Sequence, residues 1–248
     1  MAPRPVFVFA HGLFGFEKIS LPGYPIHYYR GLADELAHMG VPAVFPKVSS
    51  RDGVADRARD LAARIARLRA DTLVLVGTSM GGLDARYLAA HLDPDRRVRA
   101  VVTVGTPHRG SSAADDTMAG AGPRTWLARM FFDASIGDLT GDACRAFNDA
   151  VPDRPDVVYR SHAAARPVGE LSLHLRAMGR LIAAREGPND GLVAVSSAQW
   201  GIASPTLRAD HMELIGWSFA PASAAAARPF DHLALFRGIV ARALQDLA

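Results

Sequence analysis

The stretch that most constrains the fold is LVLVGTSMGG, residues 73–82, where an apolar run ends at a serine between glycines. The run has the pattern of a buried strand, and the residues after it, which include Leu83 and Tyr87, have that of a helix. A serine at such a strand-to-helix turn stands clear of the carboxyl edge of a sheet. Glycine weakens a strand, so we expect Gly77 and Gly81 to be required because a Cβ there would collide with the turn or the neighbouring strand.

Short apolar runs alternate with helical patterns along the rest of the chain. The predicted strands are Val6–Ala10, Pro42–Val48, Leu73–Gly77, Ala100–Gly105 and Val157–Arg160. The predicted helices carry apolar residues at helical spacing and cover Tyr28–Met39, Val54–Leu68 and His232–Leu247. In the second helix, the faces away from the apolar stripe carry Arg57, Arg64 and Arg67. This alternation predicts an α/β fold with a mostly parallel, doubly wound sheet.

One segment, from residue 112 to roughly 150, breaks the alternation. We therefore predict a single domain over residues 1–248 with a lid or cap inserted at roughly 112–150. Four bulky apolar residues of the insertion would share one side of a helix: Trp126, Leu127, Met130 and Phe131. That helix is either a mobile cover or a cap packed permanently on the core.

Composition excludes several classes of protein. The chain has 248 residues, of which 49% are hydrophobic, so it can bury a sizeable core. The net charge is only +3 and the arginines are scattered, so no nucleic-acid partner is expected. The single cysteine, Cys144, permits no internal disulfide, and no CxxC or HExxH metal pattern is present. No apolar run reaches the ~20 residues of a membrane span or resembles a signal peptide, so we expect a cytoplasmic protein, or a secreted one if a leader has been removed.

Ser79 is the predicted nucleophile, and its hydroxyl needs a general base. After such a turn the acid and then the histidine follow along the chain. Two late histidines qualify: His211 is favoured because it lies in the loop-like LRADHMEL, whereas His232 opens the last helix. Asp190, in the turn-forming PNDGLV, is the predicted acid that orients the imidazole. His108, in GTPHRG, precedes any suitable acid, so we predict a structural role for it.

Acyl transfer also needs N–H donors for a tetrahedral oxyanion. The motif HGLFG, residues 11–15, directly follows the first predicted strand, and Gly12 would let the backbone approach closely. We predict that the backbone N–H groups of Leu13 and of Met80, the residue after the nucleophile, form this oxyanion hole.

These motifs together resemble a known family. HGLFGFEKI, VGTSMGG, GTPHRGS, LTGDACRAFN, NDGLV and DHMEL occur in the order seen in the bacterial triacylglycerol lipases of the true lipase family. The resemblance extends from His11 to about Leu214. It implies the α/β-hydrolase fold, a mobile lid and hydrolysis of carboxylic esters. It gives the catalytic roles to Ser79, Asp190 and His211 and the oxyanion donors to Leu13 and Met80.

The chain departs from the family at two points. The family usually has histidine before the nucleophile, where this chain has Thr78. Its structural calcium is held by aspartates, and the corresponding positions carry Glu213 and Glu170, whose longer side chains change the geometry. We expect no cofactor for the chemistry and assign no metal ligand, while a structural calcium stays open.

The sequence-based hypothesis is a serine hydrolase of esters with apolar acyl chains. It would take a small-molecule ester or lipid substrate and contact lipid surfaces at most transiently. The alternatives are a short-chain esterase, a phospholipase or a thioesterase of the same mechanism, or an acyltransferase. A binding protein on the same fold is a further alternative, against which the intact serine, acid and histidine argue. The oligomeric state is not indicated by the sequence.

Overall fold

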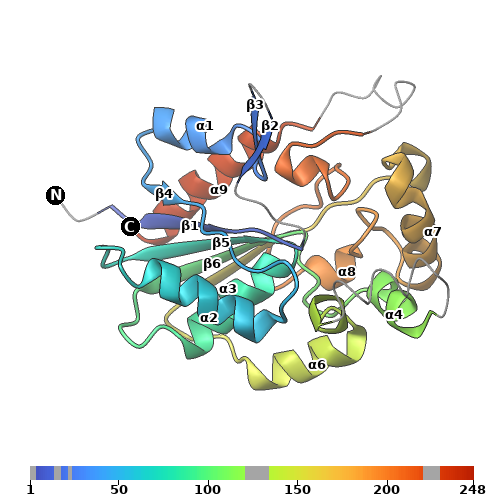
Figure 1. The fold of residues 1–248 in the computed structure, drawn as a ribbon, viewed down its shortest axis with the longest axis horizontal. Coiled ribbons are helices and arrows are strands. Elements are labelled where there is room, and N and C mark those ends of the chain that lie inside the picture. Colours follow the sequence, from blue (N-terminus) through green and yellow to red (C-terminus); the bar gives the residue numbers. More distant parts are fainter. Residues whose placement is uncertain (1–3, 14–17, 22–23, 121–133, 220–229) are drawn as a thin grey trace.

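A six-stranded sheet forms the centre of the computed structural model, which describes residues 4–13, 18–21, 24–120, 134–219 and 230–248 (Figure 1). The strand order is β4-β1-β5-β6-β7-β8, and all neighbouring strands are parallel. The strands are β1 (Val6–Ala10), β4 (Ala43–Val44), β5 (Leu73–Thr78), β6 (Val98–Val104), β7 (Val158–His162) and β8 (Ile202–Ala203). Parallel strands need crossover connections, and helices supply most of them here.

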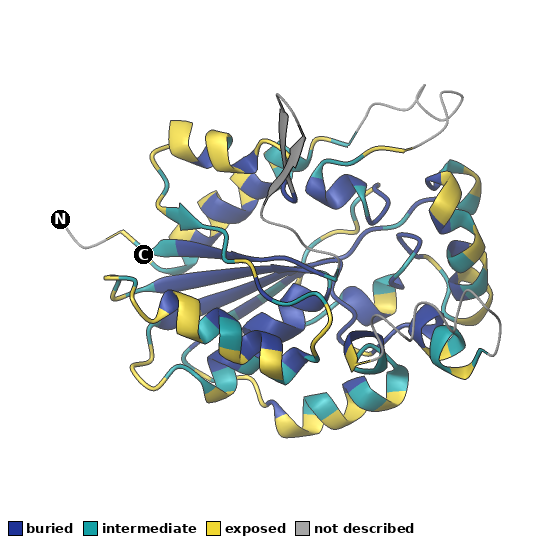
Figure 2. Ribbon diagram, in the orientation of Figure 1, coloured by how far each residue is buried: buried dark blue, intermediate teal, exposed yellow. Residues whose placement is uncertain are grey.

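Helices cover both faces of this sheet (Figure 1). On one face lie α1 (Leu32–His38) and α9 (His232–Asp246), and on the other lie α2 (Val54–Ile65) and α3 (Met80–His91). Alternate residues of β1 reach the two layers: Phe7 and Phe9 pack with the first pair of helices, and Val8 packs with the second. Both faces of the central strands are therefore buried, as Figure 2 shows, and the predicted doubly wound sheet is confirmed.

The predicted strands and helices are present, but some bounds differ: the first helix begins at Leu32 and not at Tyr28, and the second ends at Ile65 and not at Leu68. The strand expected over Pro42–Val48 is paired only at Ala43–Val44, because Pro46 has no N–H to donate to a ladder. Three of the described strands were not predicted: β8, which is two exposed residues, and the antiparallel hairpin of β2 (Lys18–Leu21) and β3 (Tyr24–His27).

The expectation that Arg57 lies on a polar helix face is wrong. Its side chain is fully buried and forms an ion pair with Asp84 of α3, with 2.7 Å between Nη2 and Oδ2. The prediction placed Arg57 on a face away from the apolar stripe, but α2 packs against α3, so the side chain of Arg57 meets protein and not solvent. The positive charge of Arg57 is tolerated in the interior because the carboxylate of Asp84 is its partner.

The segment in which a lid or cap was predicted begins with α4 (Ser112–Ala119) and ends with α6 (Gly141–Ala150). The helix expected to carry Trp126, Leu127, Met130 and Phe131 lies outside the described residues. The remaining short helices surround the end of the sheet where the site lies: η1 (Val168–Glu170), η2 (Leu173–Leu175), α7 (Arg176–Arg185), α8 (Val195–Ala198) and η3 (Glu213–Ile215). Among the described residues, every helix is too short or too polar to span a bilayer.

Candidate active site

Ser79 lies on a strained turn between β5 and α3. Its backbone has φ 54° and ψ −132°, a region that residues with a side chain rarely occupy. Backbone contacts hold it there: its N–H donates to the Val104 carbonyl at 2.9 Å, and its carbonyl accepts from the Thr106 hydroxyl at 2.8 Å. The predicted strand–turn–helix context of the serine is therefore present.

The flanking glycines make this turn sterically possible. A Cβ at Gly77 would lie 2.4 Å from the Gly81 carbonyl oxygen, and one at Gly81 would lie 2.2 Å from the Ala10 carbonyl oxygen. Both partners are backbone atoms of the turn or of the neighbouring strand, so neither can move away. The steric reason predicted for these two glycines is confirmed.

We expect Gly81→Ala to lower the free energy of unfolding by about 3 kcal/mol or more, at the upper end of overpacking effects, because the new Cβ meets backbone. Gly238→Ala is the matched control, since it lies in the middle of α9 with nothing within 4 Å of its Cβ position. The control should raise stability by about 0.5–1 kcal/mol, as alanine favours helices. Urea unfolding measures both changes, and equal effects would contradict the steric explanation.

Asp190 and His211 form a buried pair on two loops at the carboxyl edge of the sheet. His211 Nδ1 lies 2.7 Å from Asp190 Oδ2, and the two side chains are 9% and 1% exposed. The other carboxylate oxygen accepts from the N–H groups of Leu192 and Val193 at 2.9 and 2.8 Å. The His211 N–H also donates to the Asp190 carbonyl at 2.8 Å, so the two loops are joined through backbone as well as side chain.

The environment of His211 favours a proton on its ring. Burial lowers the pKa of His211, but the Asp190 carboxylate raises it by attraction and by its hydrogen bond, and Asp210 adds to this. The net shift is upward from 6.5. A carboxylate at Nδ1 fixes the tautomer and leaves Nε2 free for a second partner.

The other histidines considered in the sequence analysis, His232 and His108, lie outside the cavity that Ser79 lines. His232, at the start of α9, has its Nε2 2.6 Å from the Arg30 carbonyl oxygen and does not line the cavity with Ser79. His108 is fully buried, stacks on Trp200 and contacts Thr103 and Arg86. Burial and the neighbouring arginines hold the pKa of His108 well below 6.5, which agrees with the structural role predicted for it.

The loop after β1 approaches the serine closely. A Cβ on Gly12 would lie 2.7 Å from Ser79 Cβ, so no other residue fits there without a shift. Neither the Leu13 N–H nor the Met80 N–H donates a hydrogen bond to any residue that the structure describes. Met80 directly follows Ser79, and Leu13 directly follows Gly12, which approaches Ser79 closely. The N–H groups of both predicted oxyanion donors therefore lie near the serine and have no hydrogen-bond acceptor among the described residues.

Two buried side chains hold this loop in place. His11 accepts the Val48 N–H at Nε2, 3.1 Å away, so its Nδ1 carries the proton and donates to the Gly12 carbonyl at 2.9 Å. Burial lowers the pKa of His11 to about 4, so the ring is neutral. Arg57 donates to the His11 carbonyl at 2.7 Å while it pairs with Asp84.

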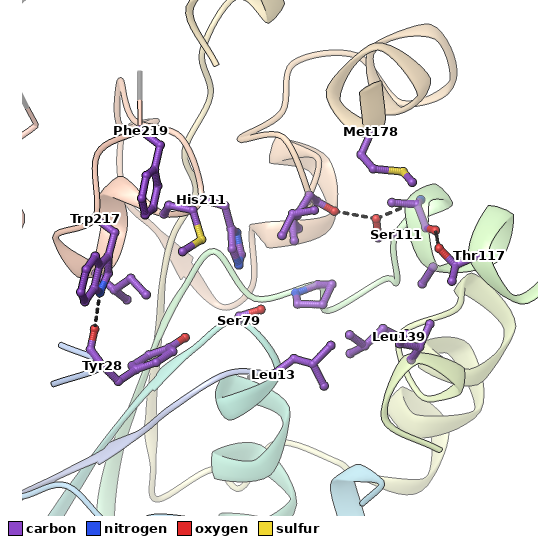
Figure 3. Close-up of a pocket in the computed structure, with 18 residues that line it drawn as sticks. Leu13, Tyr28, Ser79, Ser111, Thr117, Leu139, Met178, His211, Trp217 and Phe219 are labelled. Carbon is purple, nitrogen blue, oxygen red and sulfur yellow. Dashed lines mark hydrogen bonds between the residues drawn. The ribbon is translucent and has the colours of Figure 1, made fainter. Parts of the chain in front are cut away.

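A largely apolar cavity of about 580 Å³ opens at Ser79. Figure 3 shows Ser79 and His211 on its wall, with Leu13 and Leu139 on one side and Trp217 and Phe219 on the other. The remaining lining residues are Tyr28, Pro107, Ser111, Ala113, Ala114, Thr117, Ile136, Met178, Leu192, Val193, Met212 and Ile215. Ligand sites of this size and composition suit apolar groups of small molecules.

Comparisons with known proteins agree with this arrangement. A family model described as alpha/beta hydrolase fold matches residues 45–138. The mature Bacillus licheniformis lipase BlEst2 superposes with a TM-score of 0.69 at 25% identity, over 87% of this chain and 88% of that one. The metagenomic carboxyl esterase MGS0156 gives 0.77 at 20% identity, over 99% and 77%. The chain has the α/β-hydrolase fold.

Curated relatives of this α/β-hydrolase are lipases. It is 25% identical to triacylglycerol lipase 2 of Saccharomyces cerevisiae, over 87% of this chain and 81% of that protein. It is 29% identical to a triacylglycerol lipase of Pseudarthrobacter phenanthrenivorans, over 87% of this chain but only 64% of that one. The resemblance to bacterial triacylglycerol lipases predicted from the motifs is thereby confirmed.

The calcium positions implied by that resemblance do not suit a cation in this α/β-hydrolase. Both oxygens of Glu213 accept from the guanidinium of Arg166, at 2.6 and 3.0 Å. Glu170 accepts from Arg208 at 2.7 Å and from Arg166 at 3.3 Å. The arginines place positive charge where the ion would lie. Within the described residues, no three acidic, histidine or cysteine side chains form a metal site.

The sequence did not reveal the side chains that support the site. Arg57, Asp84 and Arg166 act through contacts between segments far apart in the chain, and no local spacing marks them. Thr78 stands where the lipase family usually has histidine, and its buried side chain explains this departure. Its hydroxyl accepts a hydrogen bond from the buried Tyr29 hydroxyl at 3.0 Å, so Thr78 packs into the core below the turn.

Proposed function

We propose that this α/β-hydrolase cleaves carboxylic esters with apolar acyl chains, with Ser79 as nucleophile, His211 as general base and Asp190 as the orienting acid. One observation carries the proposal: His211, which is paired with the buried Asp190, and the strained Ser79 line the same apolar cavity. An activated serine beside an apolar groove suits acyl transfer from a lipid-like ester.

The first half-reaction makes an acyl-enzyme. The Ser79 hydroxyl oxygen attacks the ester carbonyl carbon while Nε2 of His211 takes its proton. Asp190, hydrogen-bonded to Nδ1, stabilises the imidazolium that forms. The tetrahedral intermediate then collapses, and His211 gives the proton to the departing alcohol.

The second half-reaction releases the acid. Water attacks the acyl carbonyl while His211 takes its proton, and the proton returns to the Ser79 oxygen as the acyl bond breaks. In both steps the N–H groups of Leu13 and Met80 hold the oxyanion. Loss of one such donor typically costs ~10²–10³ in kcat. No step of this mechanism uses a cofactor.

The relatives support the reaction class, because they are named as triacylglycerol lipases and, among solved structures, as a lipase and a carboxyl esterase. The apolar lining of the cavity supports the acyl preference. The substrate is a small-molecule ester or lipid, and contact with a lipid surface would be transient.

Chain-length preference tests this function. We expect kcat/KM for p-nitrophenyl esters to rise from acetate through butyrate to octanoate or beyond, with the Ser79→Ala protein as blank. Each buried methylene contributes about 0.8 kcal/mol, so the rise is at most about fourfold per added methylene. A maximum at acetate or butyrate would contradict the apolar acyl groove and leave a short-chain esterase.

The same assay separates the remaining alternatives. Phospholipid or thioester substrates that surpass every carboxylic ester of equal chain length would replace the proposed substrate class. Analysis of the products with added alcohol distinguishes hydrolysis from acyl transfer, since an acyltransferase would form the new ester in preference to the free acid.

A further inference from the structure

Three loops meet at the Asp190–His211 pair, and their polar side chains Arg166, Asp210 and Glu213 do not line the cavity. One follows β7 and contains Arg166 and Ser172, the second carries Asp190, and the third carries His211. Backbone contacts already join them: the Arg166 N–H donates to the Asn189 carbonyl at 3.1 Å, one residue before the acid. The arrangement of Asp190 and His211 thus depends on how these loops are held together.

The Arg166 side chain connects the first loop to the third. It is 6% exposed, and its guanidinium donates from Nε and Nη2 to the two oxygens of Glu213. A two-point contact between a planar guanidinium and a carboxylate fixes orientation as well as distance. Glu213 lies two residues after His211, so the fork fixes the carboxyl side of the histidine loop.

Glu213 also contacts Asp210, the residue before the histidine. Its Oε2, besides accepting from Arg166, accepts the Asp210 N–H at 2.8 Å. Asp210 is fully buried, and its Oδ2 accepts from the Ser172 hydroxyl at 2.6 Å, which returns to the loop of Arg166. His211 is therefore held from both sides along the chain, at Asp210 and at Glu213, by one closed set of buried polar contacts.

We propose that Arg166 is a positioning residue for His211: its guanidinium is the cation that holds the histidine loop to the loop after β7, at the place where the lipase resemblance puts a calcium ion. This inference rests on the proposed function of Ser79 and His211. Two arginines, Arg166 and Arg208, face the two carboxylates of Glu213 and Glu170, so the charges of these four groups cancel. A bound divalent cation would have to displace both arginines.

Arg166→Gln tests the positioning role. It removes the cation, so the His211 loop should relax, and kcat should fall by up to about 10²-fold, the cost of a misplacement of ~1 Å. KM should change little, because Arg166 does not line the cavity. The inactivation rate with a fluorophosphonate, which depends on the base and not on acyl binding, should fall in parallel with kcat. Arg166→Lys, which keeps the charge, should recover part of both rates.

Arg154→Gln is the matched control. Arg154 is also nearly buried, at 11% exposed, and pairs with Asp93 and Asp156 at 2.8 and 2.7 Å. It precedes β7, at the amino edge of the sheet, whereas the site loops lie at the carboxyl edge. The control substitution should lower the melting temperature without lowering kcat in the folded protein. If Arg166→Gln does not fold, Glu213→Gln breaks the same fork from the other side and should show the same loss of kcat.

Three results would overturn the proposal. One is an unchanged kcat in the folded Arg166→Gln or Glu213→Gln protein, and another is Arg166→Lys no better than Arg166→Gln. The third concerns the metal: wild-type melting temperature should be the same in EDTA and in excess calcium, and a rise with calcium would show that an ion holds these loops. A wild-type protein without Ser79-dependent turnover would instead refute the proposed function, so the two failures are distinct.

Discussion

Ser79→Ala is expected to lower kcat for the best p-nitrophenyl ester by about 10⁴- to 10⁶-fold, the range seen when a serine nucleophile is removed. The structure gives the physical reason. The turn at φ 54° places this hydroxyl at the mouth of the apolar cavity, and the other cavity-lining serine, Ser111, is engaged as the N-cap of α4. In the proposed mechanism, no acyl-enzyme forms without Ser79.

The control must show that only chemistry is lost. Alanine has the same backbone preferences as serine at this strained position, so the melting temperature should change little. Ser196→Ala, an exposed serine of α8, should keep full activity. A burst of p-nitrophenol that matches the enzyme concentration should be present in the wild type and absent in Ser79→Ala. Turnover retained by the alanine variant would place the nucleophile elsewhere.

The sequence predicted the local parts of this site because steric rules act over few residues. The turn at Ser79 needs glycine at two fixed offsets, and both offsets are explained by contacts with backbone. The central strands were found for a similar reason: each of them is buried on both faces, so its sequence is an uninterrupted apolar run.

Contacts between distant segments could not be predicted in this way. Asp84 and Arg57 lie on different helices, and each alone looks like a surface charge until the helices are packed together. Likewise, the fork between Arg166 and Glu213 joins loops 47 residues apart, and Glu213 was considered only as a counterpart of a metal ligand. A charge beside an apolar stripe is normally solvated, so only the three-dimensional packing identifies the exceptions.

The same limit applied to the general base, which the sequence narrowed to His211 and His232. Each follows an aspartate, and local patterns alone favoured one because it lay in a loop. The structure brings Asp190 within 2.7 Å of His211, whereas His232 contacts the Arg30 carbonyl at the start of a helix. The choice between them is therefore the second test with a large expected effect.

His211→Ala should lower kcat by about 10⁴- to 10⁶-fold, as removal of the base is nearly as costly as removal of the nucleophile. His232→Ala should change kcat less than about threefold, because surface positions away from the site rarely matter. Steady-state kinetics of both variants and their melting temperatures give the comparison. A larger loss for His232→Ala would assign the base to the last helix.

The pH dependence of kcat/KM gives a further test of which histidine is the base. His211 accepts a proton only when neutral, so kcat/KM of the wild type must fall as the pH drops through the pKa of His211 in the free enzyme. Burial lowers that pKa, but Asp190 and Asp210 raise it above 6.5, so the acid limb should lie above 6.5. The residual activity of His211→Ala should lack this limb, while His232→Ala should keep it unchanged. An acid limb near 4 would point instead to a carboxylate or to a histidine such as His11, whose burial depresses its pKa to about 4, and would contradict His211 as the base.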